Sequence, residues 1–154
     1  MPLNKGFVGR EFPANEPYTV TSESIRDFAD AIGDANPVYR DEAAAKAAGQ
    51  PAVIAPPTYL TKLNFLYGPA MLADPDLGLN YAMVVHGDQE YSFTRPVRAG
   101  DVVIGKPRIA GIFAKGRNEF LVTEASIETV SGEKIAVARS TIVSRGTAPQ
   151  EETR

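Results

Sequence analysis

Several kinds of residue are scarce in this chain of 154 residues, and each scarcity excludes a class of function. Without any cysteine the chain forms no disulfide and carries out no thiolate chemistry. One histidine and no cysteine leave too few ligands for a structural zinc or haem site, so no metal is expected. No apolar run reaches the roughly 18 residues of a membrane-spanning helix, and no membrane partner is expected. The formal net charge of −3 argues against nucleic acid as a partner.

The residues that are present have the composition of an ordinary globular domain, with 44% hydrophobic and 23% charged side chains. This length predicts a single domain over residues 1–145, followed by a polar tail over residues 146–154. The first residues, MPLNKGFVGREF, lack the apolar region of a signal peptide. A cytoplasmic protein is therefore the expectation.

Helical patterns dominate the first half of the chain. Thr21 or Ser22 can cap a helix that ends at Gly33. Its apolar face follows the i, i+3, i+4, i+7 spacing at Ile25, Phe28, Ala29 and Ile32. A second helix is predicted over Glu42–Ala48, between a capping Asp41 and Gly49.

A third helix is predicted over residues 58–73, with Pro56 and Pro57 at its start. It is apolar almost all round, which is typical of a buried helix. Its large apolar side chains are therefore expected in the core, or for some of them along an internal tunnel: Leu60, Leu63, Phe65, Leu66 and Met71.

From residue 81 onward the apolar period changes from helical spacing to two. Strands are predicted over 81–98, 101–115, 118–130 and 133–145, with a tight hairpin at Ser131-Gly132. Strict alternation in the first strand would place His86 with Asp88 on one face and Gln89 on the other. Helices followed by antiparallel strands indicate an α+β fold in which the sheet curls around the long apolar helix.

One loop of this chain carries a recognisable motif, Asp34-Ala35-Asn36-Pro37-Val38-Tyr39. Three further segments accompany it, at 28–33, at 54–58 and at 86–101, the last containing His86-Gly87-Asp88-Gln89 and Arg95-Pro96-Val97-Arg98-Ala99-Gly100-Asp101. Together they resemble the MaoC-like (R)-specific enoyl-thioester hydratases and dehydratases, whose signature is Asp-x-Asn-Pro-x-His. The nearest branch is the N-terminal-type MaoC dehydratase domain, which includes the non-catalytic subunit of actinobacterial (3R)-hydroxyacyl-ACP dehydratases.

This resemblance implies a single hot-dog fold and a role in fatty acid metabolism. The implied ligand is an acyl-CoA or acyl carrier protein thioester, with no cofactor beyond it. The implied partner is a second hot-dog subunit, in a homodimer or a heterodimer.

The resemblance assigns the catalytic pair to Asp34 and Tyr39, but Tyr39 stands where the family has histidine. A phenol with an ordinary pKa near 10 is a poor base at neutral pH, whereas imidazole is suited to that role. Two alternatives stay open for Asp34: a retained part of the site, or a turn residue that binds a backbone N–H. Tyr39 is either a wall of the ligand tunnel or a residue packed at the rim. Asn36 is expected to hold the loop and to face the site.

Four other residues are predicted to bind substrate. Backbone N–H groups of Ala55, Thr58 or Tyr59 would stabilise negative charge on the thioester oxygen near the start of the long helix. His86 is the one residue with an ordinary pKa suited to acid–base catalysis, although it lies outside the family motif. The cations that could meet a phosphate, or simply form a solvated face, are Arg95, Arg98 and Lys106.

Three functions remain open on the sequence alone. The first is the substrate-binding subunit of an (R)-specific 3-hydroxyacyl-thioester dehydratase or enoyl-thioester hydratase, which needs a catalytic partner. The second is a non-catalytic homodimeric protein that binds acyl thioesters or other apolar ligands. The third is an enzyme of altered chemistry, such as a thioesterase that uses Asp34 or His86.

Overall fold

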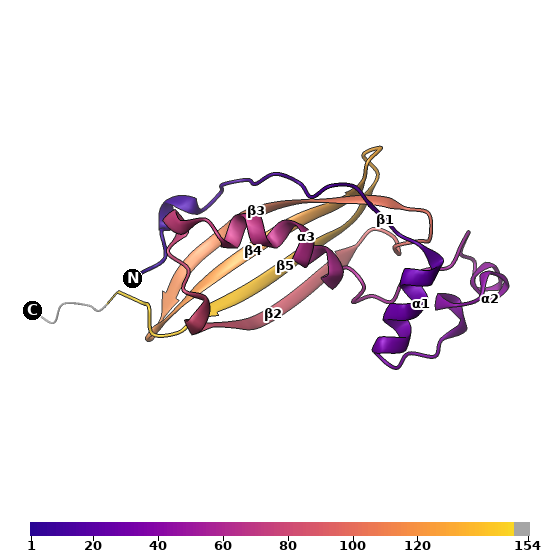
Figure 1. Ribbon diagram of the computed structural model, residues 1–154, viewed down its shortest axis with the longest axis horizontal. Coiled ribbons are helices and arrows are strands. Elements are labelled where there is room, and N and C mark those ends of the chain that lie inside the picture. Colours follow the sequence, from indigo (N-terminus) through magenta and orange to yellow (C-terminus); the bar gives the residue numbers. More distant parts are fainter. Residues whose placement is uncertain (150–154) are drawn as a thin grey trace, which may run out of the picture.

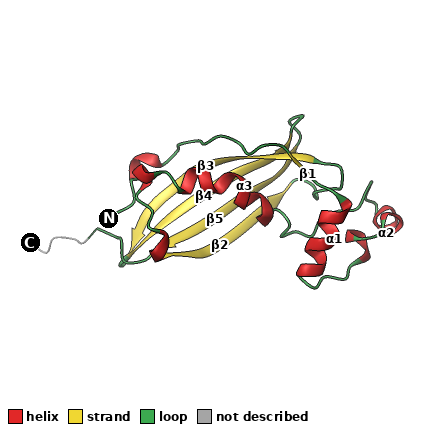
Figure 2. Ribbon diagram, in the orientation of Figure 1, coloured by secondary structure: helices red, strands yellow, loops and turns green. Residues whose placement is uncertain are grey.

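The computed structural model describes residues 1–149 and has one curved sheet with a helix lying along its concave face (Figures 1 and 2). The five strands are β1 (Tyr18–Thr19), β2 (Val84–Phe93), β3 (Val102–Lys115), β4 (Asn118–Thr129) and β5 (Lys134–Ser144). The three α-helices are α1 (Ser22–Ala31), α2 (Glu42–Ala47) and α3 (Thr61–Leu72). Four short 3₁₀ turns join them: η1 (Lys5–Phe7), η2 (Pro37–Tyr39), η3 (Pro75–Leu77) and η4 (Tyr81–Met83). The α+β hot-dog fold is confirmed.

The strand order in the sheet is β1-β3-β4-β5-β2, and all pairs are antiparallel. The two hairpins β3–β4 and β4–β5 join neighbours directly, whereas β2 crosses to pair with β5 at the far side. β2 therefore forms a long edge of the sheet, and the two-residue β1 forms part of the other edge. The Ser131-Gly132 hairpin is confirmed, with Gly132 in the left-handed region at φ 94°.

The long helix α3 rests on the sheet through a close contact between Tyr67 and Gly105 of β3. A Cβ built on Gly105 would lie 2.6 Å from Cδ1 of Tyr67, so only glycine leaves room for this ring. Tyr67 and Leu63 are buried in one core cluster with Ile127 of β4. A second cluster includes Met71 at the other end of the helix and N-terminal Leu3. The curled sheet therefore packs against α3 along its length.

The helices α1 and α2 lie together beyond the end of the sheet (Figure 1). Thr21 caps α1 by accepting a hydrogen bond from the N–H of Ser24 at 3.1 Å, and Gly33 follows the helix with φ 71°. Asp41 caps α2 in the same way by accepting from the N–H of Ala44 at 2.9 Å. Both helix starts were predicted at these capping residues, and both are confirmed.

Two predictions about the third helix are wrong. The α-helix begins at Thr61 rather than at Pro56-Pro57, because the intervening backbone forms tight turns such as Tyr59 N–H to the Pro56 carbonyl at 2.9 Å. Phe65 and Leu66, predicted as core, are 77% and 46% exposed. The sheet covers only one side of α3, so part of the apolar helix faces outward.

Two further expectations concern membranes and the tail. None of the helices within residues 1–149 is long and apolar enough to cross a membrane. The tail predicted over residues 146–154 lies outside the described residues from 150 onward.

Candidate functional site

A cavity of about 510 Å³ lies between α3, β2 and the concave face of the sheet. Its helical wall is formed by residues that recur on one side of α3: Thr61, Asn64, Phe65, Gly68 and Leu72. Its floor comes from Thr123 and Ala125 of β4 and from Ala138, Ser140 and Ile142 of β5. A cavity of this size and mostly apolar lining suits a small apolar ligand.

A hydrogen-bonded chain of side chains spans the cavity from the helix to the edge strand. Tyr67 donates its hydroxyl hydrogen to Oδ1 of Asn64 at 2.5 Å, and Nδ2 of Asn64 donates to Oε1 of Gln89 at 3.0 Å. Gln89 in turn donates to the backbone carbonyl of Arg139 at 3.1 Å. Burial, and then the negative charge that Tyr91 can carry, raises the pKa of Tyr67, so this hydroxyl stays a donor.

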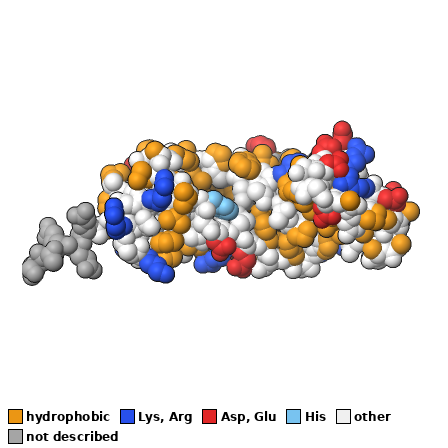
Figure 3. All heavy atoms as spheres, turned by 90° about the horizontal axis from the view of Figure 1, so that it is seen from below, with side chains coloured by type: hydrophobic (Ala, Val, Ile, Leu, Met, Phe, Trp, Pro, Cys, Tyr) orange, Lys and Arg blue, Asp and Glu red, His pale blue; other side chains and the backbone are white. Residues whose placement is uncertain are grey.

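His86 faces the cavity, and the face predicted for it from strict alternation is wrong. The register of β2 shifts between His86 and Asp88, because Gly87 is the extra residue of a β-bulge. The bulge brings His86 to the same side as Gln89, where Nε2 lies 3.0 Å from Oγ of Ser140. The imidazole is also open to solvent, and the chain's single histidine is visible as the pale-blue side chain in Figure 3.

The motif loop does not line this cavity, since it lies in the lobe formed by α1 and α2. Its first two polar side chains hold the turn: Asp34 accepts from the N–H of Asn36 at 3.0 Å, and Asn36 accepts from the N–H of Val38 at 3.2 Å. Arg40 donates to the backbone carbonyl of Asp34 at 2.6 Å. The Asp34 carboxylate, the Asn36 amide oxygen and the Asp34 backbone carbonyl therefore each accept a hydrogen bond from a residue within 36–40.

Tyr39 is nearly buried, with 9% of its surface exposed, and it belongs to the main core cluster. Burial raises the pKa of its hydroxyl, and the nearby negative charge of Asp34 raises this pKa further. The two residues assigned as a degenerate pair are thus close neighbours. At neutral pH the phenol keeps its proton, so it can donate or accept a hydrogen bond but does not serve as a general base.

The backbone groups predicted to stabilise a thioester oxygen differ in their availability. The N–H of Ala55 donates to the carbonyl of Val97 at 2.8 Å, and the N–H of Tyr59 donates to that of Pro56. Within residues 1–149 the N–H of Thr58 donates no backbone hydrogen bond, and this residue is exposed just before α3. Thr58 is therefore the one of the three whose N–H could meet a ligand.

The side chain of Tyr59 belongs to a polar cluster on the β1 side of α3. Its hydroxyl contacts Oγ of Ser24 and lies 3.3 Å from the hydroxyl of Tyr18. Burial raises the pKa of Tyr59. Burial alone would also raise the pKa of Tyr18, but hydrogen bonds with Tyr59, Ser24 and Lys62 outweigh it and lower that pKa. Tyr59 is held in the core by these contacts and does not line the cavity.

The three cations considered for phosphate binding have different partners. Arg95 is clamped by Asp101 and Glu133, and Lys106 pairs with Glu128. Arg98 has no ion-pair partner in the part of the chain that the structure describes, and its Nε is buried without a hydrogen bond. The structure thus leaves Arg98 as the available cation of the three.

Sequence reasoning did not identify Asn64, Gln89, Thr123 or Ser140 as residues of the site. A usable signal existed for Asn64, because an amide within an otherwise apolar helix is unusual. Thr123 and Ser140 carried none, since both lie on strands with ordinary alternation. Within the described range, no group of three or more His, Cys, Asp or Glu side chains is arranged to hold a metal ion.

Comparisons with known proteins point to one group. A family model described as "FAS1-like, dehydratase domain region" matches residues 6–138. A UPF0336 protein of Saccharopolyspora erythraea is 48% identical over 152 residues, covering 99% of this chain and 97% of the relative.

Two solved structures have the same fold. In the HadBC (3R-hydroxyacyl-ACP dehydratase) complex of Mycobacterium tuberculosis, a chain superposes with a TM-score of 0.79 at 27% identity, over 89% of this chain and 96% of that one. In the ChsH1-ChsH2 complex of the same organism, the TM-score is 0.69 at 23% identity, over 88% and 90% of the two chains.

Proposed function

Because the chain belongs to the family of FAS1-like dehydratase domain regions and is a MaoC-like hot-dog dehydratase domain, we propose that it is the substrate-binding subunit of an (R)-specific 3-hydroxyacyl-thioester dehydratase or enoyl-thioester hydratase. The observation that carries this proposal is the cavity of about 510 Å³ beside α3. Its alanine and isoleucine floor suits an acyl chain, which gains free energy by leaving water. CoA or acyl carrier protein would deliver the thioester.

The residues of the motif loop argue against acid–base catalysis by this chain alone. Adding water to an enoyl thioester needs a group that exchanges a proton near neutral pH. The Asp34 carboxylate already accepts the N–H of Asn36, and the pKa of Tyr39 is raised by burial and by Asp34. The chain would therefore depend on a partner that carries an intact Asp/His pair.

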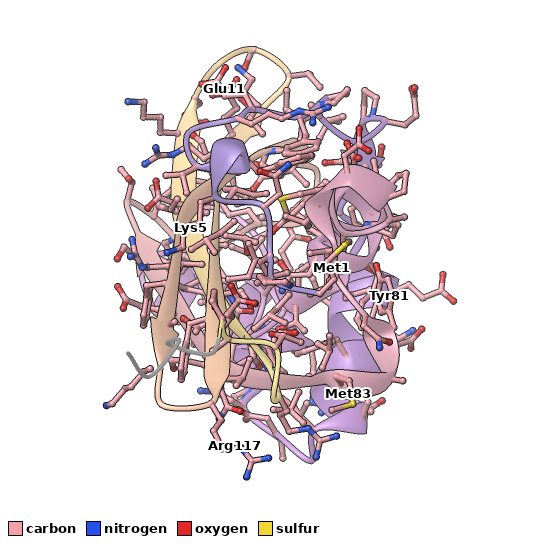
Figure 4. The ribbon with its side chains drawn as sticks, turned by 90° about the vertical axis from the view of Figure 1, so that its left-hand side faces the viewer. Met1, Lys5, Glu11, Tyr81, Met83 and Arg117 are labelled. Carbon is pink, nitrogen blue, oxygen red and sulfur yellow. The ribbon has the colours of Figure 1, made fainter. Side chains whose placement is uncertain are left out.

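A second hot-dog subunit is the partner that fits the exposed surface. The ten-residue strand β2 is a free edge whose backbone groups can pair with another strand. Exposed apolar side chains lie beside it on α3, η4 and β2: Phe65, Leu66, Tyr81, Met83, Val85 and Phe93. Hydrophobic side chains, drawn in orange, spread over the face of the molecule that Figure 3 shows. In Figure 4, Tyr81 and Met83 lie on the opposite side of the molecule from Lys5. Such a patch favours a protein interface.

The same cavity also favours the alternative of a non-catalytic homodimeric protein that binds acyl thioesters. The two functions differ in one respect, since only the first contributes to turnover in a complex. Hydration of crotonyl-CoA, followed by loss of the enoyl absorbance, separates them. The purified chain, a co-expressed MaoC-type subunit with an intact motif, and the two together would be compared.

We expect activity with the pair and none with this chain alone. In the pair, Asp34→Asn should keep most of the activity, because asparagine still accepts the Asn36 N–H but is not a base. Asp34→Ala serves as the control that loses the turn. Activity of the chain alone that disappears in Asp34→Asn would show an independent enzyme and contradict the proposal. A pair no faster than the catalytic subunit alone would favour the binding protein.

A further inference from the structure

The cavity floor is crossed by a single row of polar side chains, which the strand register brings together. Thr123 of β4 pairs with Ser140 of β5, and Ser140 pairs with Gln89 of β2. The row on one side contains Ala125, Ala138 and Tyr91, and the row on the other contains Leu121 and Ile142. His86 belongs to this last row but turns toward Ser140 and contacts its hydroxyl at 3.0 Å. The row of Thr123, Ser140 and Gln89 thus places polar side chains in the middle of an otherwise mostly apolar floor.

The groups of this row differ in how far their hydrogen bonds are satisfied. The amides of Gln89 and Asn64 bond each other and use Arg139 and Tyr67 as further partners. Ser140 and His86 have one mutual bond, although a hydroxyl and an imidazole can each make more. Polar groups that line an apolar cavity with unused capacity lose free energy when an alkyl chain covers them. They are suited to a ligand that carries an oxygen at this level.

A nucleophilic role for the Ser140–His86 pair does not fit the backbone around it. Ser140 lies in the middle of β5, and its strand neighbours are paired on both sides with β4 and β2. Backbone N–H groups engaged in two ladders are not free to stabilise an oxyanion, which acyl transfer to serine requires. In the part of the chain that is described, the second ring nitrogen of His86 also has no carboxylate partner. The pair is better suited to binding than to attack.

We propose that His86 and Ser140, with Thr123 beside them, form a binding site for a hydroxyl or carbonyl oxygen on an internal carbon of the acyl chain. The inference rests on the proposed function, because it assumes that the cavity holds an acyl chain. Apolar floor residues on both sides, Ala125 and Ala138 on one and Ile142 on the other, place the oxygen away from the ends of the cavity. The row meets α3 at Asn64, which bonds Gln89. Asn64 is three residues after Thr61, so the row lies about 5 Å along the helix from Thr61 at a rise of roughly 1.5 Å per residue.

The test compares dodecanoic acid with its monohydroxy isomers, one for each internal carbon, by calorimetric titration of the full-length chain. We expect at least one internal isomer to bind about tenfold more tightly than dodecanoic acid, the usual effect of one satisfied buried hydrogen bond. Ser140→Ala and His86→Phe should remove this preference and leave dodecanoic acid bound equally or more tightly. Thr141→Val is the matched control, because the adjacent residue of β5 is not part of the cavity lining.

Equal binding of dodecanoic acid and all isomers would overturn the oxygen site and leave the acyl cavity standing. A preference that survives both substitutions would overturn the assignment to His86 and Ser140. Binding of none of these ligands would overturn the assignment of an acyl chain to this cavity, whereas the hydration assay with the partner subunit tests the proposed function separately. Incubation with dodecanoyl-CoA gives a further outcome, since a covalent acyl group on Ser140 would show a nucleophile instead of a binding site.

Discussion

Asp34 and Tyr39 show how much of a site depends on the surroundings of single residues. The carboxylate of Asp34 accepts a backbone N–H two residues on, so it fixes a turn whether or not it contacts a ligand. The hydroxyl of Tyr39 is next to that charge inside the core, which raises its pKa. A residue that matches a catalytic motif can therefore keep its place in the fold without acid–base function.

The raised pKa of the Tyr67 hydroxyl can be tested by measuring how stability depends on pH. Its hydroxyl is buried and donates to Asn64, so the folded chain holds this proton more tightly than the unfolded chain does. The resulting stabilisation is complete below the ordinary tyrosine pKa of about 10 and is lost as the pH rises above it. Tyr67→Phe should be less stable than the natural chain at neutral pH by about 1 kcal/mol.

The difference between the two proteins should shrink at alkaline pH, because only the natural chain has this phenol to ionise. Urea denaturation at a series of pH values from about 8 to 11 measures this difference in the free energy of unfolding. The pH dependence that arises from groups common to both proteins cancels in the comparison. A difference that stays constant across the series would contradict the assignment to the Tyr67 hydroxyl.

At the scale of elements, the bulge in β2 decides which side chains enter the cavity. Glycine suits this position because a Cβ would lie 3.0 Å from Cγ2 of Val143 and 3.2 Å from the carbonyl oxygen of Thr141, closer than most Cβ atoms lie to their neighbours. Without the bulge, alternation would turn His86 away from Gln89 and out of the cavity. One glycine thus controls the direction of the only histidine.

Gly87→Ala should therefore displace the edge strand and lower the free energy of unfolding by about 1–3 kcal/mol, as other overpacking substitutions do. Chemical denaturation measures the loss, and NMR of the His86 ring measures its altered contact with Ser140. Gly111→Ala is the matched control, since this glycine also lies at a register shift but its Cβ would meet nothing closer than 3.9 Å. Equal stability of both variants would show that the bulge tolerates a side chain.

At the scale of the whole molecule, the position of α3 on the sheet leaves an apolar side uncovered. The helix is apolar almost all round, yet Phe65 and Leu66 remain exposed next to the free edge of β2. A long free edge beside an apolar patch is a liability for a lone chain. The proposed association of two hot-dog subunits would cover both features at once.

Phe65→Asp should abolish this association, because it places a charge where the apolar ring would be buried. Analytical ultracentrifugation should then give the mass of a single chain, 16.5 kDa, in place of that of a pair. Val130→Asp is the control, since Val130 is 55% exposed at the β4–β5 hairpin, away from the proposed interface. A pair that persists in Phe65→Asp, or that is lost in Val130→Asp, would contradict the proposed interface.

Elements that depend on interactions between nearby residues could be predicted from the sequence. Thr21 and Asp41 cap their helices through bonds to residues three positions on, and Gly132 allows its hairpin by its own backbone freedom. The motif at Asp34–Tyr39 also identified the family, because the residue types of a short loop can be recognised without knowing what surrounds them.

The residues that line the cavity could not be predicted in this way, because segments distant in the sequence bring them together. Thr123, Ser140 and Gln89 come from three strands, and pairing register alone brings them into one row. Phe65 became exposed because the sheet covers one side of α3, which helical periodicity does not specify when every side is apolar. The direction of His86 followed from a bulge against β5, a contact between residues more than 50 positions apart. Periodicity predicts which faces an element has, but packing between distant segments selects the face that meets a ligand.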